Sequence, residues 1–522
     1  MNPSLKITFF KTLETDLPAR LREDEFSPEF RLVGTSSRKE QHSFYDTFDW
    51  HAFEKKLSAV RIKNTLLILS LDSGIETART VLEGAPSSLF ASSLPAGPAK
   101  DLLSACSSIR AFAKLASFVV QLAVWKILDD DGKTIGVLTR ETFTHQGNNE
   151  TMPFLSVCSL LPLKGYQEET EQFAKRLASR FSLSEAFGFR ELFRMLMTAS
   201  GRSIQGYSSK ITLHLDPDAP VHESARKLLF SSFSVMKANE GGLKKNIDTE
   251  FLHDFRVSVR RSRSLLRQLS GVFSPEDTER FLRGFSALGK KSNSLRDCDV
   301  YLLRKDAYFR CLPGFLQPHL DRFFIELETS RKRFHRQFCR YLDSEDYRDF
   351  CVGLEGFLAS HELPDPEKAP EARLPTIDVA SRGIGKAWKK VVRRGRLACD
   401  DTTDEELHEL RISCKKLRYL LEFFSSVYPH DTITPVVRML RELQENLGTF
   451  VDYSVQVRFL QERLDSIVAA QDSHLFAASI GGLITNLDMK KEETRAAFHK
   501  AFRSFDHEET RQRFRKLLEK EQ

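Results

Sequence analysis

The chain has 522 residues, of which 41% are hydrophobic and 29% charged. No stretch approaches the roughly 18 uninterrupted apolar residues that a membrane-spanning helix needs, and the first residues lack the basic and apolar segments of a secretion signal. We therefore expect a cytoplasmic, globular protein of more than one domain with no membrane partner. The eight cysteines include no CxxC pair, which predicts neither a disulfide framework nor a zinc site.

The net charge of +6 comes entirely from the C-terminal part of the chain. Residues 1–218 hold 26 basic and 26 acidic residues, so the rest of the chain holds 52 and 46 of the totals of 78 and 72. Because this excess is small, any site for a polyanion has to come from the arrangement of the basic residues.

Residues 1–215 contain short segments of β type. "LKITFF", "LLILSLD" and "PFLSVCSLLPL" are apolar or alternating runs, and "DDDG" at 129–132 predicts the turn of a hairpin. "GYQEETEQFAKRLASRF" has the periodicity of a helix. These segments predict an α+β N-terminal domain with an antiparallel sheet.

Beyond Pro217 and Pro220 the pattern changes to long segments with a helical period, which predicts an all-α domain over residues 219–520. The Pro- and Glu-rich segment 362–375 divides this domain into halves of about 219–361 and 376–520.

The two halves share residues at an offset of 155 positions. The matched pairs include His253 with His408, Arg256 with Arg411, Ser258 with Ser413, Arg260 with Lys415, Arg263 with Arg418, Leu266 with Leu421 and Asp297 with Asp452. "FHRQF" at 334–338 also matches "FHKAF" at 498–502, at an offset of 164. Two repeats are too few for an open solenoid, so we expect two duplicated helical bundles related by a pseudo-twofold axis.

Three of the expected helices carry a stripe of basic residues opposite an apolar side. The stripes consist of His253, Arg256, Arg260, Arg263 and Arg267 in the first half, His408, Arg411, Lys415 and Arg418 in the second, and Arg382, Lys386, Lys389, Arg393 and Arg396 on the helix 381–396. The spacing of three and four residues places each stripe on one side of its helix, because each residue advances about 100°.

These stripes allow two interpretations: a solvated helix face or a site for a polyanion. Solvated faces usually mix charges, whereas neighbouring like charges destabilise a helix by about 0.2–0.5 kcal/mol per pair. A polyanion would remove that repulsion and accept charge-assisted hydrogen bonds. His253 and His408 are either ordinary polar residues or phosphate donors, and neither has a second His or Cys at metal-ligand spacing. The stripes therefore favour a polyanion site without a metal.

"LHDFRVSVRRSR" with "NSLRDCDVYLL", and "LHELRISCKKLRY" with "ENLGTFVDYSV", resemble the paired motifs of the CHAD family of histidine-containing α-helical domains. The resemblance covers residues 220–518. It implies binding of inorganic polyphosphate and, as for some members, association with polyphosphate granules. The second repeat departs from the pattern, since Val451 stands where the first has Arg296.

The N-terminal region resembles, over residues 43–71 and 207–215, the CYTH or triphosphate-tunnel family. That resemblance implies a tunnel- or barrel-like sheet. The family's first strand alternates acidic residues, but "SLKITFF" and the later strand "FLSVCSLLPL" carry none. Such carboxylates hold Mg²⁺ against phosphates, so we expect a degenerate domain. Lys6, Arg61, Lys63 and Lys210 either line a basic tunnel or lie at the surface.

Together, these patterns predict a non-catalytic protein without a cofactor that binds inorganic polyphosphate in a basic groove between the two helical halves. Two alternatives stay open. One is a phosphohydrolase that acts on triphosphate or polyphosphate through the N-terminal domain. The other is a nucleic-acid-binding protein, which the lack of aromatic residues on the basic arcs disfavours. The sequence does not indicate the oligomeric state.

Overall fold

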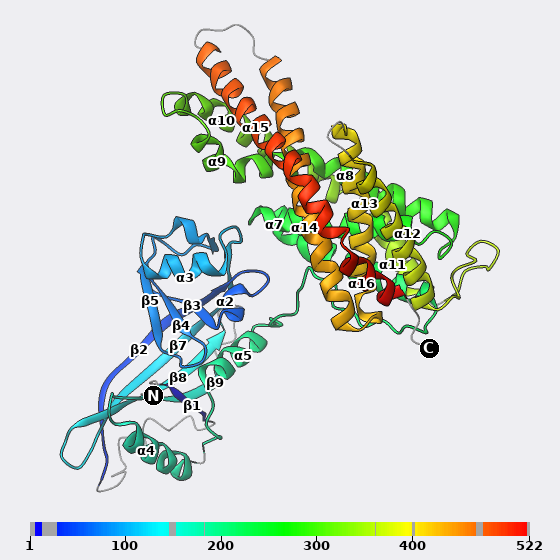
Figure 1. Ribbon diagram of the computed structural model, residues 1–522. Helices are drawn as coiled ribbons and strands as arrows, with labels where there is room; N and C mark the ends of the chain where they lie inside the picture. Colours follow the sequence, from blue (N-terminus) through cyan, green and yellow to red (C-terminus); the bar gives the residue numbers. More distant parts are fainter. Residues whose placement is uncertain are drawn as a thin grey trace. The chain divides into compact units, whose positions relative to one another are not determined.

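The computed structural model describes residues 6–12, 29–145, 153–181, 183–360, 362–398, 402–465 and 473–518. The chain divides into two compact units, Met1–Ser208 with Asn246–Glu250, and Ser209–Lys245 with Phe251–Gln522. The first unit contains an antiparallel sheet and the second only helices (Figure 1). The predicted order of an α+β and then an all-α region is confirmed.

The first unit is built on one antiparallel sheet with the strand order β1-β9-β8-β7-β2-β3-β4-β5, in which β6 also pairs with β7. The strands are β1 (Thr8–Lys11), β2 (Arg31–Asp46), β3 (Leu57–Ile62), β4 (Thr65–Ser70), β5 (Glu76–Val81), β6 (Ser88–Leu89), β7 (Phe112–Leu128), β8 (Thr134–His145) and β9 (Pro153–Pro162). The helices are α2 (His51–Glu54), α3 (Pro98–Cys106), α4 (Gln167–Arg180) and α5 (Phe189–Ala199). β7 and β8 form the predicted hairpin, whose turn uses Gly132 at a φ of 75°.

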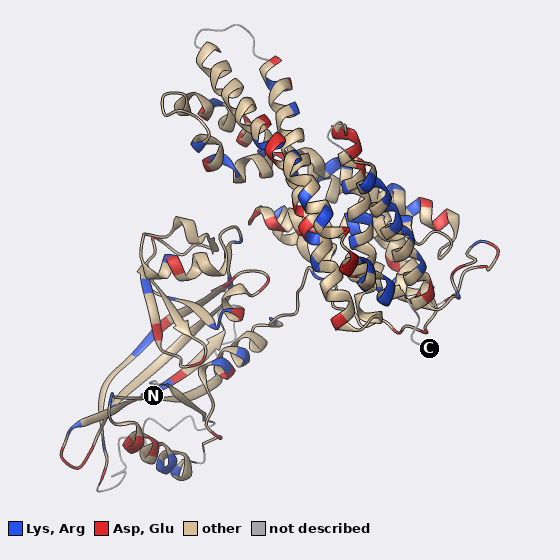
Figure 2. Ribbon diagram, in the orientation of Figure 1, with Lys and Arg blue, Asp and Glu red and all other residues tan. Residues whose placement is uncertain are grey.

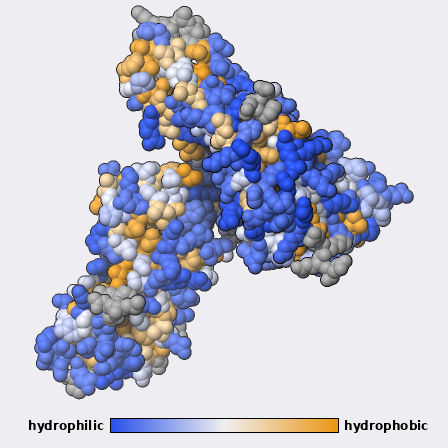
Figure 3. Space-filling model, viewed as in Figure 1, coloured by the Kyte–Doolittle hydropathy of each residue, from blue (hydrophilic) through white to orange (hydrophobic). Residues whose placement is uncertain are grey.

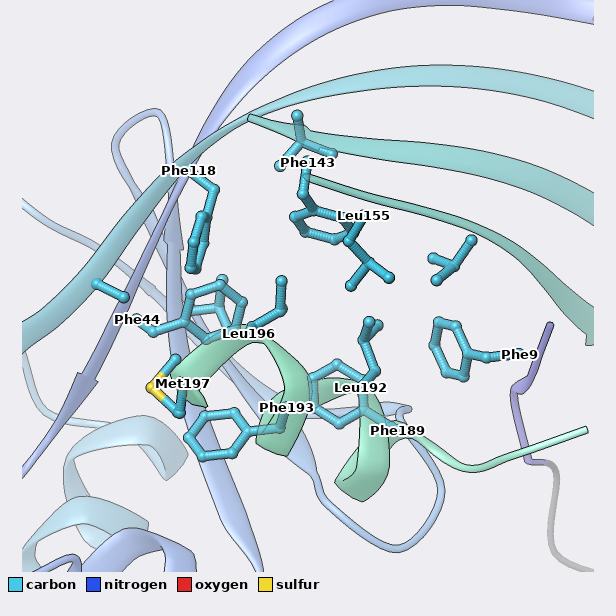
Figure 4. Close-up of a cluster of buried hydrophobic side chains, with 14 of the residues drawn as sticks. Phe9, Phe44, Phe118, Phe143, Leu155, Phe189, Leu192, Phe193, Leu196 and Met197 are labelled. Carbon is cyan, nitrogen blue, oxygen red and sulfur yellow. The ribbon is translucent and has the colours of Figure 1, made fainter. Parts of the chain in front are cut away.

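The sheet curls so that its two ends approach each other. The backbone N–H of Ile7, next to β1, donates to the carbonyl of Ser73 in the turn after β4, at 2.8 Å. Its inner face is filled by apolar side chains. Phe189, Phe193 and Leu196 of α5 pack there against a cluster of strand residues (Figure 4). The interior at this end is therefore a packed hydrophobic core.

The four basic residues considered for a tunnel do not line the interior together. Lys6, Lys63 and Lys210 are exposed, and the ammonium of Lys63 is 3.5 Å from a carboxylate oxygen of Glu40. Arg61 pairs in register with Leu66, which belongs to the cluster on the outer face beneath α3. Lys6 and Lys210 therefore fit the surface interpretation, whereas Arg61 is half-buried on the outer face and the ammonium of Lys63 reaches a carboxylate of the inner face.

The second unit consists of helices throughout its described residues. The first half contains α6 (Val221–Lys244), α7 (Thr249–Gln268), α8 (Pro275–Leu303), α9 (Lys305–Arg310), α10 (Gln317–Leu342) and α11 (Glu345–Ala359). The second half contains α12 (Thr376–Leu397), α13 (Asp404–Phe423), α14 (His430–Asp465), α15 (Ser473–Phe505) and α16 (Glu508–Leu518).

The halves are paired at equivalent residues where α6 and α12 begin. Pro220 and Pro375, which are 155 positions apart, form an antiparallel bridge. The N–H of Val221 donates to Leu374 and that of Thr376 to Ala219, each at 2.9 Å. An antiparallel pairing of equivalent residues is what a pseudo-twofold axis through this point requires.

The two halves also share a hydrophobic cluster at the far ends of their long helices. Tyr301 of α8, Phe323 and Phe324 of α10, Leu460 of α14 and Ile480 of α15 are buried in it. The two halves therefore share part of one hydrophobic core, which two separate bundles would not do.

Candidate anion-binding site

The helices α7 and α13 are held in place by their apolar sides. The equivalent leucines Leu266 and Leu421 are 1% and 0% exposed. A capping box fixes the start of α13, because Thr403 and Glu406 exchange side-chain and backbone hydrogen bonds. Burial of this side leaves the opposite side of each helix, with its basic residues, for other contacts.

On α7, Arg256 is anchored to the neighbouring helix α8. Its guanidinium donates to the carbonyl of Gly289 at 3.1 Å, to Oγ of Ser292 at 2.5 Å and to Oδ1 of Asn293 at 2.9 Å. The guanidinium of Arg263 approaches the same point of α8, since its Nη1 lies 3.2 Å from where a Cβ on Gly289 would stand.

On α13, the equivalent arginines approach α14 in the same way. Arg411 Nη2 lies 3.5 Å from Oδ1 of Asp452. Arg418 donates to Glu422 at 2.6 Å and to Oε1 of Gln444 at 3.3 Å, and Gln444 is the equivalent of Gly289. Both repeats therefore place two arginines against the next helix.

Between these anchored arginines lie Arg260 and Lys415, which are equivalent in the two repeats. Neither forms a hydrogen bond or ion pair with any residue that the structure describes, although both are half-buried. Burial, Arg411 and Arg260 lower the pKa of Lys415 to about 8, so the two repeats bring their cations together here. We call Arg256, Arg260, Arg263, Arg411, Lys415 and Arg418 the central basic cluster.

Several donors of this cluster have no acceptor. The Nε atoms of Arg256, Arg263 and Arg411 are buried and make no hydrogen bond with a described residue. Burial and the charge of Arg260 lower the pKa of Arg256 to about 10. A buried donor without an acceptor is costly, and crowded cations raise that cost. An anion with several oxygens would satisfy these donors and offset the repulsion.

The two histidines differ in their surroundings. His253 is half-buried, and its Nδ1 accepts a hydrogen bond of 2.9 Å from Arg296 of α8. His408 is exposed, and the equivalent of Arg296 is the buried Val451. The departure seen in the sequence thus removes the histidine's arginine partner from the second repeat. Arg267, the last residue of the α7 stripe, is exposed.

The stripe of α12 lies apart from the other two stripes. α12 packs on α13 through Arg394, which donates to the carbonyl of Glu409 and to Oγ of Ser413. These residues lie on the opposite side of α13 from Arg411 and Lys415, because each residue advances about 100°. α13 therefore separates the α12 stripe from the central basic cluster. The affected residues are Arg382, Lys386, Lys389, Arg393 and Arg396, all exposed.

The sequence alone does not reveal this separation, because a helical wheel shows which side of a helix is charged and not which neighbour that helix packs against. Lysines and arginines follow one another along the ribbons of α12 and α13 (Figure 2), and the surface of the helical unit in this view is largely hydrophilic (Figure 3). Packing divides them into two sites.

Some residues of the site carry no stripe pattern and were missed. Asn293 and Ser292 of α8 and Gln444 of α14 position the arginines. Arg304, just after α8, lies 3.8 Å from Asp452. The sequence contained one indication of these residues: the matched pair Asp297 and Asp452 lies in the segments of α8 and α14 that face the stripes.

No group of three or more His, Cys, Asp or Glu residues that could hold a metal occurs in the described part of the chain. The described cysteines are free thiols, and Cys399 lies outside the described residues. None of the described helices is long and apolar enough to cross a bilayer.

Residues 227–461 match the family model of the CHAD domain, so the prediction of a CHAD domain in the helical region is confirmed. An uncharacterized protein from each of two Mycobacterium tuberculosis strains is 26% identical over 234 residues. This alignment covers 43% of this chain and 43% of each relative, so the match spans less than half of their length.

Two solved structures resemble the helical region. The CHAD domain from the plant Ricinus communis has 24% identity and a TM-score of 0.47, over 56% of this chain and 94% of that chain. PptA from Streptomyces chartreusis has 17% identity and a TM-score of 0.43, over 55% of this chain and 100% of that chain. The resemblance of the N-terminal region to the triphosphate-tunnel family stays a prediction.

Proposed function

We propose that this protein binds inorganic polyphosphate through the central basic cluster without chemically changing it. The observation that carries the proposal is the unpaired state of Arg260 and Lys415. Two half-buried cations from the two repeats meet there without a hydrogen bond or ion pair to any described residue, and the nearby charge of Asp452 offsets their repulsion only in part, since the pKa of Lys415 is still lowered. Such a pair costs stability unless an anion lies between the two charges.

The shape of the cluster favours a chain of phosphates over a single one. Arg256 and Arg263 of α7 are about two helical turns apart, and so are Arg411 and Arg418 of α13. The pseudo-twofold arrangement presents two similar rows of donors. A linear polyanion with an oxygen-rich repeat can contact both rows, and the CHAD family's association with polyphosphate supports the same ligand.

We also propose that the N-terminal unit has no phosphohydrolase activity. Apolar side chains of α5 fill much of the sheet's inner face. β1 and β9, the strands in which the triphosphate-tunnel family would carry acidic residues, contain no carboxylate that could face the interior. Alternation along the strands does place Glu40 of β2 and Glu141 of β8 on this face, and these two carboxylates were missed.

The test is a titration of the full-length protein with polyphosphate of defined length, in competition with RNA and DNA at matched charge and with and without Mg²⁺. We expect saturable binding of polyphosphate that weakens as salt increases, because each contacted phosphate releases counterions. Affinity that does not change with salt, or preference for nucleic acid, would contradict the proposal. We separately expect this protein to associate with polyphosphate granules, which imaging of the tagged protein in cells would check.

A further inference from the structure

The basic stripe that packing separates from the central cluster forms part of a second basic depression. Lys389, Arg393 and Arg396 of α12 and Arg511 and Arg515 of α16 line a depression of about 650 Å³, together with Trp388, Val392 and Leu397. We call these five basic residues the outer basic surface. Apolar walls beside charges of one sign lower the local dielectric and strengthen the attraction for an anion.

Positive charge exceeds negative charge in this depression. Arg396 and Arg511 share the carboxylate of Asp506, and Arg511 and Arg515 lie 3.4 Å and 3.6 Å from Glu508, so these three cations have two acidic partners. Lys389 and Arg393 are exposed and have no ion pair or hydrogen bond with any described residue.

The pseudo-twofold symmetry shows that the fold does not need this surface. α6 is the equivalent of α12, and equivalent positions such as Leu229 and Ile384, or Met236 and Val391, are 0% exposed in both helices. The residues of α6 equivalent to Lys386, Lys389, Arg393 and Arg396 are Ser231, Ser234, Ala238 and Gly241. One half thus performs the same structural task without these charges, so the outer basic surface is a feature added to the second half alone.

We propose that the outer basic surface binds a second chain of polyphosphate, so that one protein molecule links two polymer chains. This inference rests on the proposed function of the central basic cluster. The two sites lie on opposite sides of α13, so a short chain bound at one leaves the other open. On a long polymer, two sites in one molecule act at a raised effective concentration and hold neighbouring segments or chains together.

The aromatic residue in the depression argues for polyphosphate over single-stranded nucleic acid. Trp388 stacks on Phe514, with ring centroids 4.8 Å apart and an interplanar angle of 6°. One face of the indole is therefore already covered, and no other aromatic residue lines the depression in the part of the chain described. A binder of single strands would present open rings for successive bases.

The experiment measures how many short polyphosphate chains of one defined length each protein molecule binds, and whether immobilised long polyphosphate captures a second, labelled polymer through the protein. The outer variant is Lys389→Glu with Arg393→Glu, and the central variant is Arg260→Gln with Lys415→Gln. None of these side chains has a hydrogen bond or ion pair with a described residue, so both variants should fold. The matched control is Lys332→Glu with Arg336→Glu, an exposed pair on α10 at the same spacing.

We expect two short chains per wild-type and control molecule, one per molecule of either variant, and capture of the labelled polymer by the wild type and control only. If the wild type binds only one chain, and the outer variant keeps this binding while the central variant loses it, the inference of a second site is overturned and the proposed function stands. If the wild type binds only one chain, and the outer variant loses this binding while the central variant keeps it, the proposed function is overturned instead. Capture of labelled RNA in preference to polyphosphate would overturn both.

Discussion

Arg260 and Lys415 occupy equivalent positions in the two repeats, and neither forms an ion pair with a described residue. Burial, Arg411 and Arg260 together lower the pKa of Lys415 to about 8. Elsewhere on the helices a lysine can pair with an acidic neighbour at helical spacing, as Lys227 does with Glu223. Arg260 and Lys415 lie where the two halves bring their stripes together, which is where a ligand shared by both halves would bind.

Removing these two charges should abolish binding at the central cluster without harming the fold. We expect Arg260→Gln with Lys415→Gln, in the background of Lys389→Glu with Arg393→Glu, to lose binding of a short polyphosphate while the melting temperature stays equal or rises. The reason is that neither charge is paired and both repel their neighbours. Fluorescence titration and thermal melting measure the two effects.

The control for that variant removes two charges of the same kind from other faces. Lys416 is exposed and about 100° round α13 from Lys415, and Arg283 makes only an exposed pair with Glu279. Lys416→Gln with Arg283→Gln should leave affinity nearly unchanged. An unfolded central variant would show that Arg260 and Lys415 are structural, and full binding would place the site elsewhere.

Arg256 should behave differently from Arg260, although both belong to one stripe. Its guanidinium connects α7 to α8 through Gly289, Ser292 and Asn293. We expect Arg256→Met to lower the free energy of unfolding by about 1–3 kcal/mol, because buried acceptors lose their donor. Urea denaturation of this variant beside Arg260→Met checks the contrast, and equal stability of the two would contradict the anchoring role.

The depressed pKa of Lys415 predicts the pH dependence of both stability and binding. The folded pKa of about 8 lies below the ordinary value of about 10.4, so the folded state loses this proton first. The lysine's charge therefore costs stability below pH 8, and this cost disappears as the pH rises from about 8 to 10.4. A bound polyanion favours the protonated form, so affinity should fall over the same range and binding should take up a proton.

Calorimetry at a pH just above 8, in buffers with different ionisation enthalpies, measures this proton uptake. Lys415→Arg keeps the positive charge but does not titrate in this range, so it should bind without taking up a proton. An uptake that persists in this variant would assign the titration to another group.

The apolar sides of α7 and α13 give a prediction of the opposite kind. Leu266 and Leu421 are equivalent and fully buried. Leu266→Ala and Leu421→Ala should each cost about 2–5 kcal/mol of stability, because each leaves a cavity, and should keep polyphosphate affinity under conditions where the protein is folded. Loss of affinity without loss of stability would show that the helix faces are assigned the wrong way round.

The parts of this structure that were predictable are those encoded by local periodicity. The hairpin of β7 and β8 and the buried sides of α7 and α13 follow from spacing alone. The polar first half of β2 was missed. Residues 31–41 are mostly exposed and are held in the sheet by backbone pairing to β7, and backbone hydrogen bonds leave no pattern of apolar side chains.

The site shows the same division between local and non-local information. The offset of 155 residues predicted that Arg260 and Lys415 are equivalent, and the structure brings their charges close enough to interact. The position of α12 depends on which side of α13 it contacts, through Arg394. The periodicity of each helix does not determine this contact. The sequence therefore could not show that the basic residues of α12 and α13 form two separate surfaces.

The last prediction concerns the two carboxylates on the inner face of the N-terminal sheet. Burial raises the pKa of Glu141 to about 7, and the carboxylate of Glu40 lies close to Arg38, His42 and Lys63. Mg²⁺ is usually held by one or two ionised carboxylates together with the phosphates of its substrate, whereas Glu141 is partly protonated at neutral pH and Glu40 already pairs with the cations of Arg38 and Lys63. We therefore expect the full-length protein to release no phosphate from triphosphate in the presence of Mg²⁺. Glu40→Gln and Glu141→Gln should leave this baseline unchanged. Release of phosphate by the wild type that either substitution abolishes would establish an active tunnel and replace the non-catalytic proposal for this unit.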